Sequence, residues 1–374
     1  MNYISLLYEA LQRKRELEKA KHFLPTFNHK FSPTEASYKM PMSFYGIKNK
    51  KPAVLGSCAR AVFFDKMAID TSDFKNHMVI QEEKVSFTTT LRQNFGKLWE
   101  ELLVRELKDI IENVIWNDKF KFEHTDTAGN VITLSGEYDI LLKTRDGLWS
   151  GIELKSGNGY GFEMSHVFGK SKKTIRREFE EIAVDPTKPT PVPKHLLQTI
   201  LYLYHFKKNT DYPIDTWSIL YMTSDKYTLR QFDITLRNTV AGYVPEITTY
   251  DIDTRTLEPL SQVFPVPIIE IPVEAVLGRF HYVDSHIRNR VVPKKDFNTL
   301  IGDYEVEEME KLGYLSKSRA ADMKSGKVKQ CDWQCSYCKW YPQCLAMSDD
   351  SFDFDTLVPA TADSCLCIEE PVEI

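Results

Sequence analysis

The sequence predicts an α/β fold in which a central mixed sheet is flanked by helices. Two consecutive segments, 131–143 and 148–155, alternate apolar and polar residues in the manner of half-buried strands. An amphipathic helix is expected over 88–114 and a strongly apolar helix over 194–208. With 374 residues, of which 42% are hydrophobic, the chain can bury the core of one large domain.

The same periodicity assigns the other elements in chain order: a basic helix over 3–22, an irregular stretch over 23–52, a strand near 119–125, strands over 216–222 and 228–234, and a helix over 273–290. Pro293 follows the last helix and acts as its stop signal. The stretch 240–270 is rich in Pro and Thr and shows no clear pattern.

The turn between the first two strands decides which side chains meet. Because side chains alternate between faces, a two-residue loop would place Asp139 and Glu153 on opposite faces of the hairpin. A three-residue loop that ends in a left-handed Gly147 instead puts both apolar rows on one face and Asp139 across from Glu153. We therefore expect Asp139, Glu153 and Lys155 to converge on the polar side of the hairpin.

This trio has the chemistry of a divalent-cation site. Mg²⁺ takes carboxylate oxygens, and a neighbouring ammonium can steady the attacking water or the charge that develops on a phosphoryl group. Taken alone, the pattern is more typical of a salt bridge on a solvated sheet face, since such short matches are frequent. The motifs elsewhere in the chain favour the cation site.

The two long helices carry further polar candidates. In the apolar helix, His195, Gln198, Tyr202 and His205 share one face. A buried helix normally aims such a stripe at polar partners, because an unpaired buried polar group is costly. In the amphipathic helix, Glu100 lies at the edge of the apolar stripe, where it can serve either as a ligand or as an ordinary surface carboxylate.

A long connection, 156–193, leaves the strand that carries Lys155. Loops of this length are usually functional or mobile. The connection either grips phosphates or is a solvated insertion, and both interpretations stay open. Its basic residues include Lys170, Lys172, Lys173, Arg176 and Arg177.

Four cysteines within fourteen residues form the strongest single signal. In a protein of the reducing interior of a cell, such a cluster usually binds metal. Zinc would take Cys331, Cys335, Cys338 and Cys344 locally. An iron–sulfur cluster would instead take the last three and one remote thiolate. Only one CxxC pair is present, and aromatic residues surround it, which favours the iron–sulfur cluster.

Five motifs occur in the order seen in the RecB-like branch of the PD-(D/E)xK nucleases: Gly96-Lys97-Leu98-Trp99-Glu100, Gly136-Glu137-Tyr138-Asp139, Glu153-Leu154-Lys155, Gln198-Thr199-Ile200-Leu201-Tyr202 and Cys335-x2-Cys338-x5-Cys344. The chain resembles this branch over most of 56–344. Cys58, with Arg60 two residues on, resembles the N-terminal fourth ligand of its iron–sulfur staple. The members associated with CRISPR adaptation and the AddB subunit of bacterial recombination nucleases are similar in layout.

The resemblance implies a PD-(D/E)xK restriction-endonuclease-like core with a C-terminal iron–sulfur region. It implies that Asp139 and Glu153 hold Mg²⁺ or Mn²⁺ and that Lys155 is the catalytic lysine. Glu100 stands where many relatives carry a metal-binding histidine. Gln198 and Tyr202 would line the site. A 4Fe-4S cluster would be held by Cys58, Cys335, Cys338 and Cys344. The extra Cys331 and the long loop depart from the pattern.

The predicted function is metal-dependent hydrolysis of DNA phosphodiesters, as an exonuclease in replication, recombination or repair. DNA is the expected partner, with a helicase or recombination protein beside it. The alternative is a non-catalytic DNA-binding or assembly subunit that retains the nuclease fold and binds zinc at the cysteines.

The expected organisation is a lead-in over 1–52, a nuclease domain over 53–347 and an acidic, disordered tail over 348–374. Eight of the 53 acidic residues fall in the tail, so the remainder carries 48 basic against 45 acidic residues. No apolar run is long enough to cross a bilayer, and the N-terminus lacks the pattern of a secretion signal. A cytoplasmic protein without a membrane partner is therefore expected.

Overall fold

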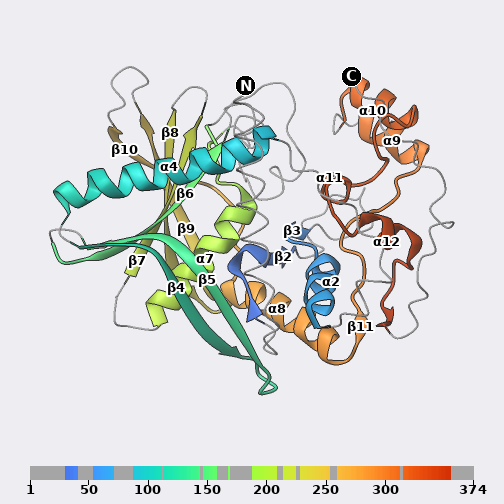
Figure 1. The fold of residues 1–374 in the computed structure, drawn as a ribbon, viewed down its shortest axis with the longest axis horizontal. Coiled ribbons are helices and arrows are strands. Elements are labelled where there is room, and N and C mark those ends of the chain that lie inside the picture. The colour runs from blue at the N-terminus through green and yellow to red at the C-terminus, as the bar shows by residue number, and fades with distance from the viewer. Residues whose placement is uncertain are drawn as a thin grey trace, which may run out of the picture.

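The computed structural model describes most of the chain, in these ranges: 30–40, 54–70, 87–111, 113–143, 146–157, 167–168, 188–208, 214–224, 228–252, 259–311 and 315–354. These residues form an α/β fold with a mixed central sheet flanked by helices, as the sequence predicts (Figure 1). The predicted helix over 3–22 and the basic residues of the long loop lie outside the described residues. Within those ranges, no helix has the length and apolar character needed to span a membrane.

The central sheet has eight strands. Seven follow the order β1-β5-β6-β7-β8-β9-β10, and the eighth, β4, pairs with β5 along the edge opposite β1 and β6. The sheet is mixed because β1 runs parallel to β5 and β6 parallel to β7, while the other pairs are antiparallel. Its strands are β1 (Lys30–Phe31), β4 (Asn113–Thr125), β5 (Val131–Lys143), β6 (Trp149–Gly157), β7 (Ile214–Thr223), β8 (Leu229–Thr239), β9 (Gly242–Ile252) and β10 (Pro259–Pro265).

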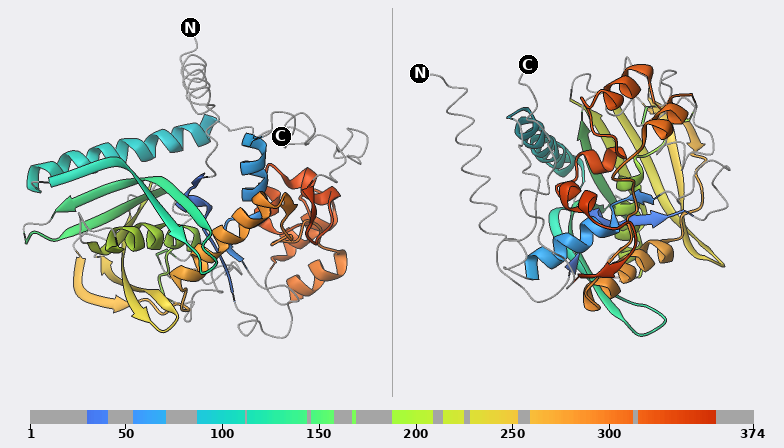
Figure 2. Two further views of the ribbon diagram at one scale, coloured as in Figure 1. Left: turned by 90° about the horizontal axis from the view of Figure 1, so that it is seen from below. Right: turned by 90° about the vertical axis from the view of Figure 1, so that its right-hand side faces the viewer.

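Two long helices cover opposite faces of this sheet (Figure 2). They are α4 (Phe87–Ile110) and α7 (Pro193–Lys208). The remaining helices are η1 (Pro33–Glu35), α2 (Ala59–Asp70), α8 (Val273–Arg288), α9 (Asp303–Lys311), α10 (Lys317–Lys324), α11 (Trp333–Ser336) and α12 (Tyr341–Ala346). Two small sheets pair β2 (Ser37–Lys39) with β3 (Val54–Gly56) and β11 (Val291–Val292) with β12 (Phe352–Asp353).

The structure differs from the predicted elements where tertiary contacts decide the backbone. The described part of the stretch expected to be irregular contains β1, η1 and β2. η1 is capped because Ser32 and Glu35 satisfy each other's backbone N–H groups. The Pro- and Thr-rich stretch 240–270 supplies β9 and β10, which extend the sheet through antiparallel pairing. α4 ends at Ile110, earlier than predicted, because β4 begins at Asn113.

The predicted register of the β5–β6 hairpin is confirmed. Ile140 pairs with Ile152 and Lys143 with Trp149, so continuing the ladder by one step sets Asp139 across from Glu153. Gly147 has a φ of +82°, the left-handed conformation that the loop parity requires.

A close contact between β6 and β7 holds α7 near the hairpin. Trp217 is fully buried and packs against Tyr202 and Phe206 of α7 in tilted ring pairs, with ring centroids 5.3 and 5.5 Å apart. A Cβ at Gly151 would lie 2.2 Å from the Trp217 ring, so only glycine allows this packing. The polar side chains of α7 are thereby brought against β6.

The first seven residues of the expected acidic tail, 348–354, pack against the body. Residues Phe352–Asp353 form β12 on β11, and Phe354 is buried against Phe63 at 5.8 Å between ring centroids. Residues 348–354 therefore belong to the body rather than to a tail, and 355–374 lie outside the described residues.

Candidate functional site

The candidate site lies at an interruption within the sheet. β4 pairs with β5 from Asn113 to Thr125, apart from Asn117 opposite Asp139, so β1 and β6 share the other side of β5. β1 meets β5 at 133–134 and β6 meets it at 140–143, which leaves 135–139 between them. Side chains from β5, β6, α4 and α7 converge on this interruption.

Glu153 is the central group of the site. It is 1% exposed, and its Oε1 accepts hydrogen bonds from the Lys155 ammonium and from Gln198 Nε2, the latter at 2.8 Å. Its Oε2 is buried and finds no hydrogen-bond donor among the described residues. A buried carboxylate with one oxygen unsatisfied is costly, because each unpaired buried polar atom loses about 1–3 kcal/mol or more if charged.

Asp139 lies beside Glu153 and Lys155, and its side chain accepts a hydrogen bond from the backbone of β6. Its Oδ2 accepts the backbone N–H of Leu154 at 2.6 Å, so the side chain satisfies a donor where β6 diverges from β5. Burial raises the pKa of Asp139, although Lys155 and the Leu154 N–H act in the opposite direction. Asp139, Glu153 and Lys155 therefore meet at one place, as the hairpin register predicts.

Lys155 stays charged in this setting. Burial works against its ammonium, but the surrounding carboxylates Glu153, Asp139 and Glu100 outweigh burial and raise the Lys155 pKa. The Lys155 side chain is 22% exposed, against 1% for Glu153. Lys155 and Glu153 do not form a solvated surface salt bridge, because the Glu153 carboxylate is almost fully buried.

Glu100 joins the site from α4. It is half-buried, and it interacts electrostatically with Asp139 and Lys155 and by hydrogen bond with Asn117. Burial, followed by the Asp139 charge, raises the pKa of Glu100. The next residue on the helix, Glu101, is exposed, as its position relative to the apolar stripe predicts.

Gln198 and Tyr202 fix the orientation of Glu153. Gln198 Nε2 donates to both Glu153 Oε1 and the Tyr202 hydroxyl, each at 2.8 Å. The Tyr202 hydroxyl donates in turn to the backbone carbonyl of Glu137 at 3.0 Å, within the interrupted stretch of β5. The i, i+4 spacing on α7 thus joins the two strands through one hydrogen-bonded chain.

The two histidines of the same stripe have different surroundings. His195 Nδ1 lies 3.1 Å from the Tyr221 hydroxyl, one helical turn before Gln198. Burial and the nearby Lys155 charge lower the pKa of His195 well below its usual range. His205 stacks on Phe122 at 5.0 Å between ring centroids, among the aromatic side chains of the core.

The residues of the site fit a divalent cation by donor type. Among the described residues, no three His, Cys, Asp or Glu side chains are grouped as in a formed metal site. The donors are nevertheless carboxylate oxygens, the ligands that Mg²⁺ and Mn²⁺ prefer, and one of them is the unsatisfied Glu153 Oε2.

Cation binding should weaken as the pH falls below neutrality. Burial, helped by Asp139, raises the pKa of Glu153 to about 7, so below that pH a proton occupies the carboxylate that the cation needs. We expect the apparent affinity for Mn²⁺ to fall about tenfold per pH unit below 7 and to level off above it. Mn²⁺ titrations followed by electron paramagnetic resonance would measure this.

The matched control for this titration is Glu101→Gln, on the exposed side of the same helix as Glu100. It should leave both the affinity and its pH dependence unchanged. An affinity that stays constant from about pH 5.5 to about pH 7.5 would contradict a role for Glu153 as a ligand.

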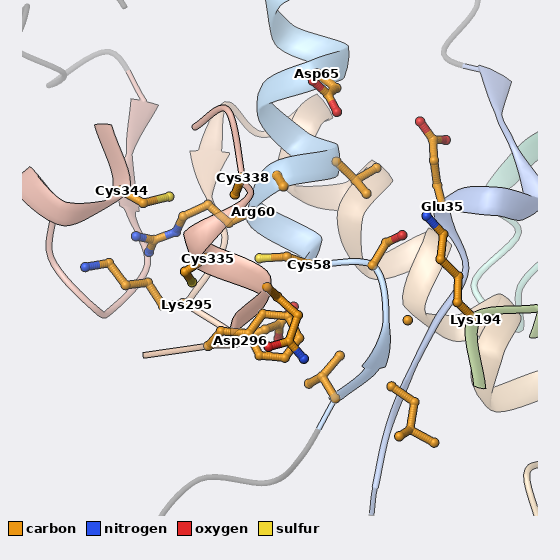
Figure 3. Close-up of a pocket in the computed structure, with 18 of the residues that line it drawn as sticks. Glu35, Cys58, Arg60, Asp65, Lys194, Lys295, Asp296, Cys335, Cys338 and Cys344 are labelled. Carbon is orange, nitrogen blue, oxygen red and sulfur yellow. The ribbon is translucent and has the colours of Figure 1, made fainter. Parts of the chain in front are cut away.

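Cys58 and three of the C-terminal cysteines lie about 280 residues apart in sequence but line one cavity. A cavity of about 620 Å³ is lined by Cys58 at the start of α2 and by Cys335, Cys338 and Cys344 from the C-terminal region (Figure 3). Cys331 lies near Cys335 but does not line this cavity. All five are free thiols. Cys331 packs in the same small cluster as Cys335, with Cys58 and Cys338 against it, and no three of the described cysteines are grouped as in a formed metal site.

Burial holds these thiols in their protonated form. Burial is the main cause that raises the pKa of each, to about 11 for Cys331 and Cys344. The pKa of Cys58 and that of Cys335 rise further, with neighbouring thiols adding to the effect of burial. Soft thiolate donors in a shielded cavity are the ligands that zinc and iron–sulfur clusters use.

Arg60 joins α2 to the C-terminal segment through hydrogen bonds to backbone carbonyls. It is fully buried, and its Nε donates to the carbonyl of Pro293 at 2.6 Å. Its terminal nitrogens donate to the carbonyls of Ser348, Asp349 and Asp350 at 2.9, 3.4 and 3.1 Å. One side chain of α2 thus holds the C-terminal segment against the start of the domain.

Two cations flank Cys344, and the spacing of residues in the sequence does not predict them. The guanidinium of Arg60 is within hydrogen-bonding reach of the Cys344 thiol, and Lys295 acts on it electrostatically. The Lys295 side chain is 5% exposed and bonds to Asp349 and Thr299 at 3.0 Å each. Buried positive charge at this position can offset the negative charge of a thiolate-ligated group.

Comparison with known proteins adds little to this description. No protein-family model matches the chain, and no curated protein matches it. The crystal structure of SSO0001 is similar with 13% sequence identity, over 84% of this chain and 97% of that chain, at a TM-score of 0.38. A TM-score at this level establishes no shared fold.

Proposed function

We propose that this chain is a metal-dependent deoxyribonuclease with a RecB-like PD-(D/E)xK core, acting as an exonuclease in DNA replication, recombination or repair. The observation that carries the proposal is the state of Glu153. A carboxylate that is 1% exposed is held on one oxygen by Lys155 and Gln198, while its other oxygen has no donor among the described residues. Such an arrangement is costly in a purely structural role and suits a cation ligand.

Each residue has a chemical role in this proposal. Asp139 and Glu153 would hold Mg²⁺ or Mn²⁺, with Glu100 as the third carboxylate, and the ion supplies Lewis-acid chemistry at the phosphate. The Lys155 ammonium lies close to Glu153 and is partly exposed, so it can stabilise charge that develops on a phosphate oxygen. Gln198 and Tyr202 hold Glu153 in place.

The experiment that tests this function is digestion of end-labelled single- and double-stranded DNA by the 374-residue chain. The protein would be purified anaerobically and assayed with Mg²⁺, with Mn²⁺ and with EDTA. Metal-dependent loss of label or a ladder of shortened products is the expected result. DNA that is bound but left intact under all these conditions would support the alternative of a non-catalytic subunit.

We further propose that a 4Fe-4S cluster joins Cys58 to Cys335, Cys338 and Cys344. The single cavity lined by these four residues supports this set. Cys58→Ser should then lower the iron content and the broad absorption near about 400 nm, whereas Cys331→Ser should leave both close to those of the parent protein. Stoichiometric zinc, lost from the Cys331→Ser variant, would contradict the cluster and its ligand set.

A further inference from the structure

A second cavity lies between α4 and the sheet, next to the candidate site. It has a volume of about 200 Å³. Trp99 and Leu103 of α4 form one wall, and Leu154 of β6 and Leu220 of β7 form the opposite wall. Two residues of the candidate site, Glu100 and Lys155, also line it. An apolar cavity therefore adjoins the group that we place at the scissile phosphate.

α4 packs loosely enough to leave this space. Trp99, Leu102 and Leu103 are each only half-buried, whereas Val104 is 3% exposed. The polar stripe of α7 occupies the other face of β6, where Gln198 bonds to Glu153. Leu154 and Lys155, the two residues that follow Glu153 on β6, both line the cavity.

We propose that this cavity receives one unpaired nucleobase, that of the nucleotide next to the scissile phosphate. The inference rests on the proposed nuclease function, and it adds a subsite to it. The volume lies below the 300–1,000 Å³ of pockets for drug-sized ligands and suits one planar ring system. An indole and aliphatic walls stack on the face of a base, and Lys155 beside them meets the phosphate of the same strand.

This subsite has a defined specificity. Most of its lining residues are apolar, and the polar ones are Glu100, Glu106, Lys155 and Ser156. Stacking on the apolar walls is open to every base, so sequence preference at this position should be weak. A paired base cannot enter without leaving the duplex. Single strands and frayed ends should therefore be cleaved faster than blunt, G·C-rich ends.

The test is an abasic scan of an end-labelled oligonucleotide, with one abasic residue moved along the strand. For the parent protein, kcat/KM at the adjacent bond should fall about 5- to 150-fold when the abasic residue reaches the subsite, the range expected for loss of one stacked base. Trp99→Leu, which keeps apolar volume but removes the indole, should reduce cleavage of the intact strand. It should add no further loss on the strand with the abasic residue at the subsite.

Leu98→Ala is the matched control, because Leu98 neighbours Trp99 on α4 but is 62% exposed and does not line the cavity. A second readout does not need cleavage. With Asp139→Asn protein in Ca²⁺, 2-aminopurine placed at the subsite should lose fluorescence on stacking against Trp99, and this quenching should be absent in the Trp99→Leu background.

Two outcomes would overturn the subsite. The first is cleavage indifferent to the position of the abasic residue. The second is a Trp99→Leu variant that loses thermal stability while its dependence on the abasic position stays that of the parent, which would make the cavity an incompletely filled core. If the parent protein cleaves no DNA at all, the nuclease proposal fails, and the 2-aminopurine quenching alone decides whether the cavity binds a base.

Discussion

Replacement of Lys155 by methionine should reduce DNA cleavage by about a thousandfold or more. The ammonium bonds directly to the buried Glu153 carboxylate, and the lysine side chain is 22% exposed, so it is the cation best placed to stabilise charge on a phosphate beside Glu153. Methionine keeps the apolar stem that lines the cavity beside α4. Single-turnover digestion of end-labelled DNA with saturating Mg²⁺ would measure the loss.

Lys97→Met provides the control for this substitution. Lys97 is an exposed lysine of α4 within electrostatic range of Glu100, so its loss changes the local charge without removing a group that contacts Glu153. Cleavage by this variant should stay within a few-fold of the parent. A Lys155→Met protein that retains cleavage within tenfold of the parent would exclude the proposed role of the lysine.

Asp139 should be tested with asparagine rather than alanine. The carboxylate accepts the Leu154 N–H at 2.6 Å, and an amide oxygen can keep this hydrogen bond while it weakens cation binding. Alanine would leave that backbone donor unpaired and so add a structural defect to the chemical one. Loss of activity in Asp139→Asn with an unchanged unfolding temperature would therefore report on chemistry alone.

Replacement of Arg60 by methionine should destabilise the domain by about 3–5 kcal/mol. The buried guanidinium satisfies four backbone carbonyls, from Pro293 and from Ser348, Asp349 and Asp350. Methionine fills similar space but leaves these acceptors without their donor. Urea unfolding followed by circular dichroism would give the free energy of unfolding.

Arg105→Met is the matched control, because its side chain is 71% exposed and bonds only to the neighbouring Glu106 among the contacts described. It should change the free energy of unfolding by less than about 0.5 kcal/mol. Arg60→Met should also lower the yield of the proposed cluster, since the segments that carry Cys58 and Cys344 lose a contact that joins them. A destabilisation below about 1 kcal/mol would contradict the role given to Arg60.

The parts of the site that follow from strand and helix periodicity could be predicted from the sequence. Only one loop parity puts both apolar rows of the hairpin on one face, and the structure has that register with Gly147 at a positive φ. The i, i+4 spacing of Gln198 and Tyr202 predicts a shared face of the helix, and both side chains do reach the same hydrogen-bonded chain.

The parts that depend on contacts distant in sequence could not be predicted. The carbonyls that Arg60 binds lie up to 290 residues from it, and a carbonyl has no sequence signature. The interruption of β5 depends on the two-residue strand β1, which is too short to show an alternating pattern. The burial of Lys295 beside Cys344 could not be predicted either, because only the surrounding structure distinguishes it from other lysines.

The hydrogen bonds between Arg60 of α2 and the C-terminal segment can form only late in synthesis of the chain. Arg60 and Ser348 are 288 residues apart, so a ribosome that adds about 5–20 residues per second needs roughly 15–60 s between them. Throughout that interval Cys58 has been made while Cys344, its cavity neighbour, has not. The cluster proposed above would need both thiols, so it could be inserted only after translation has passed Cys344.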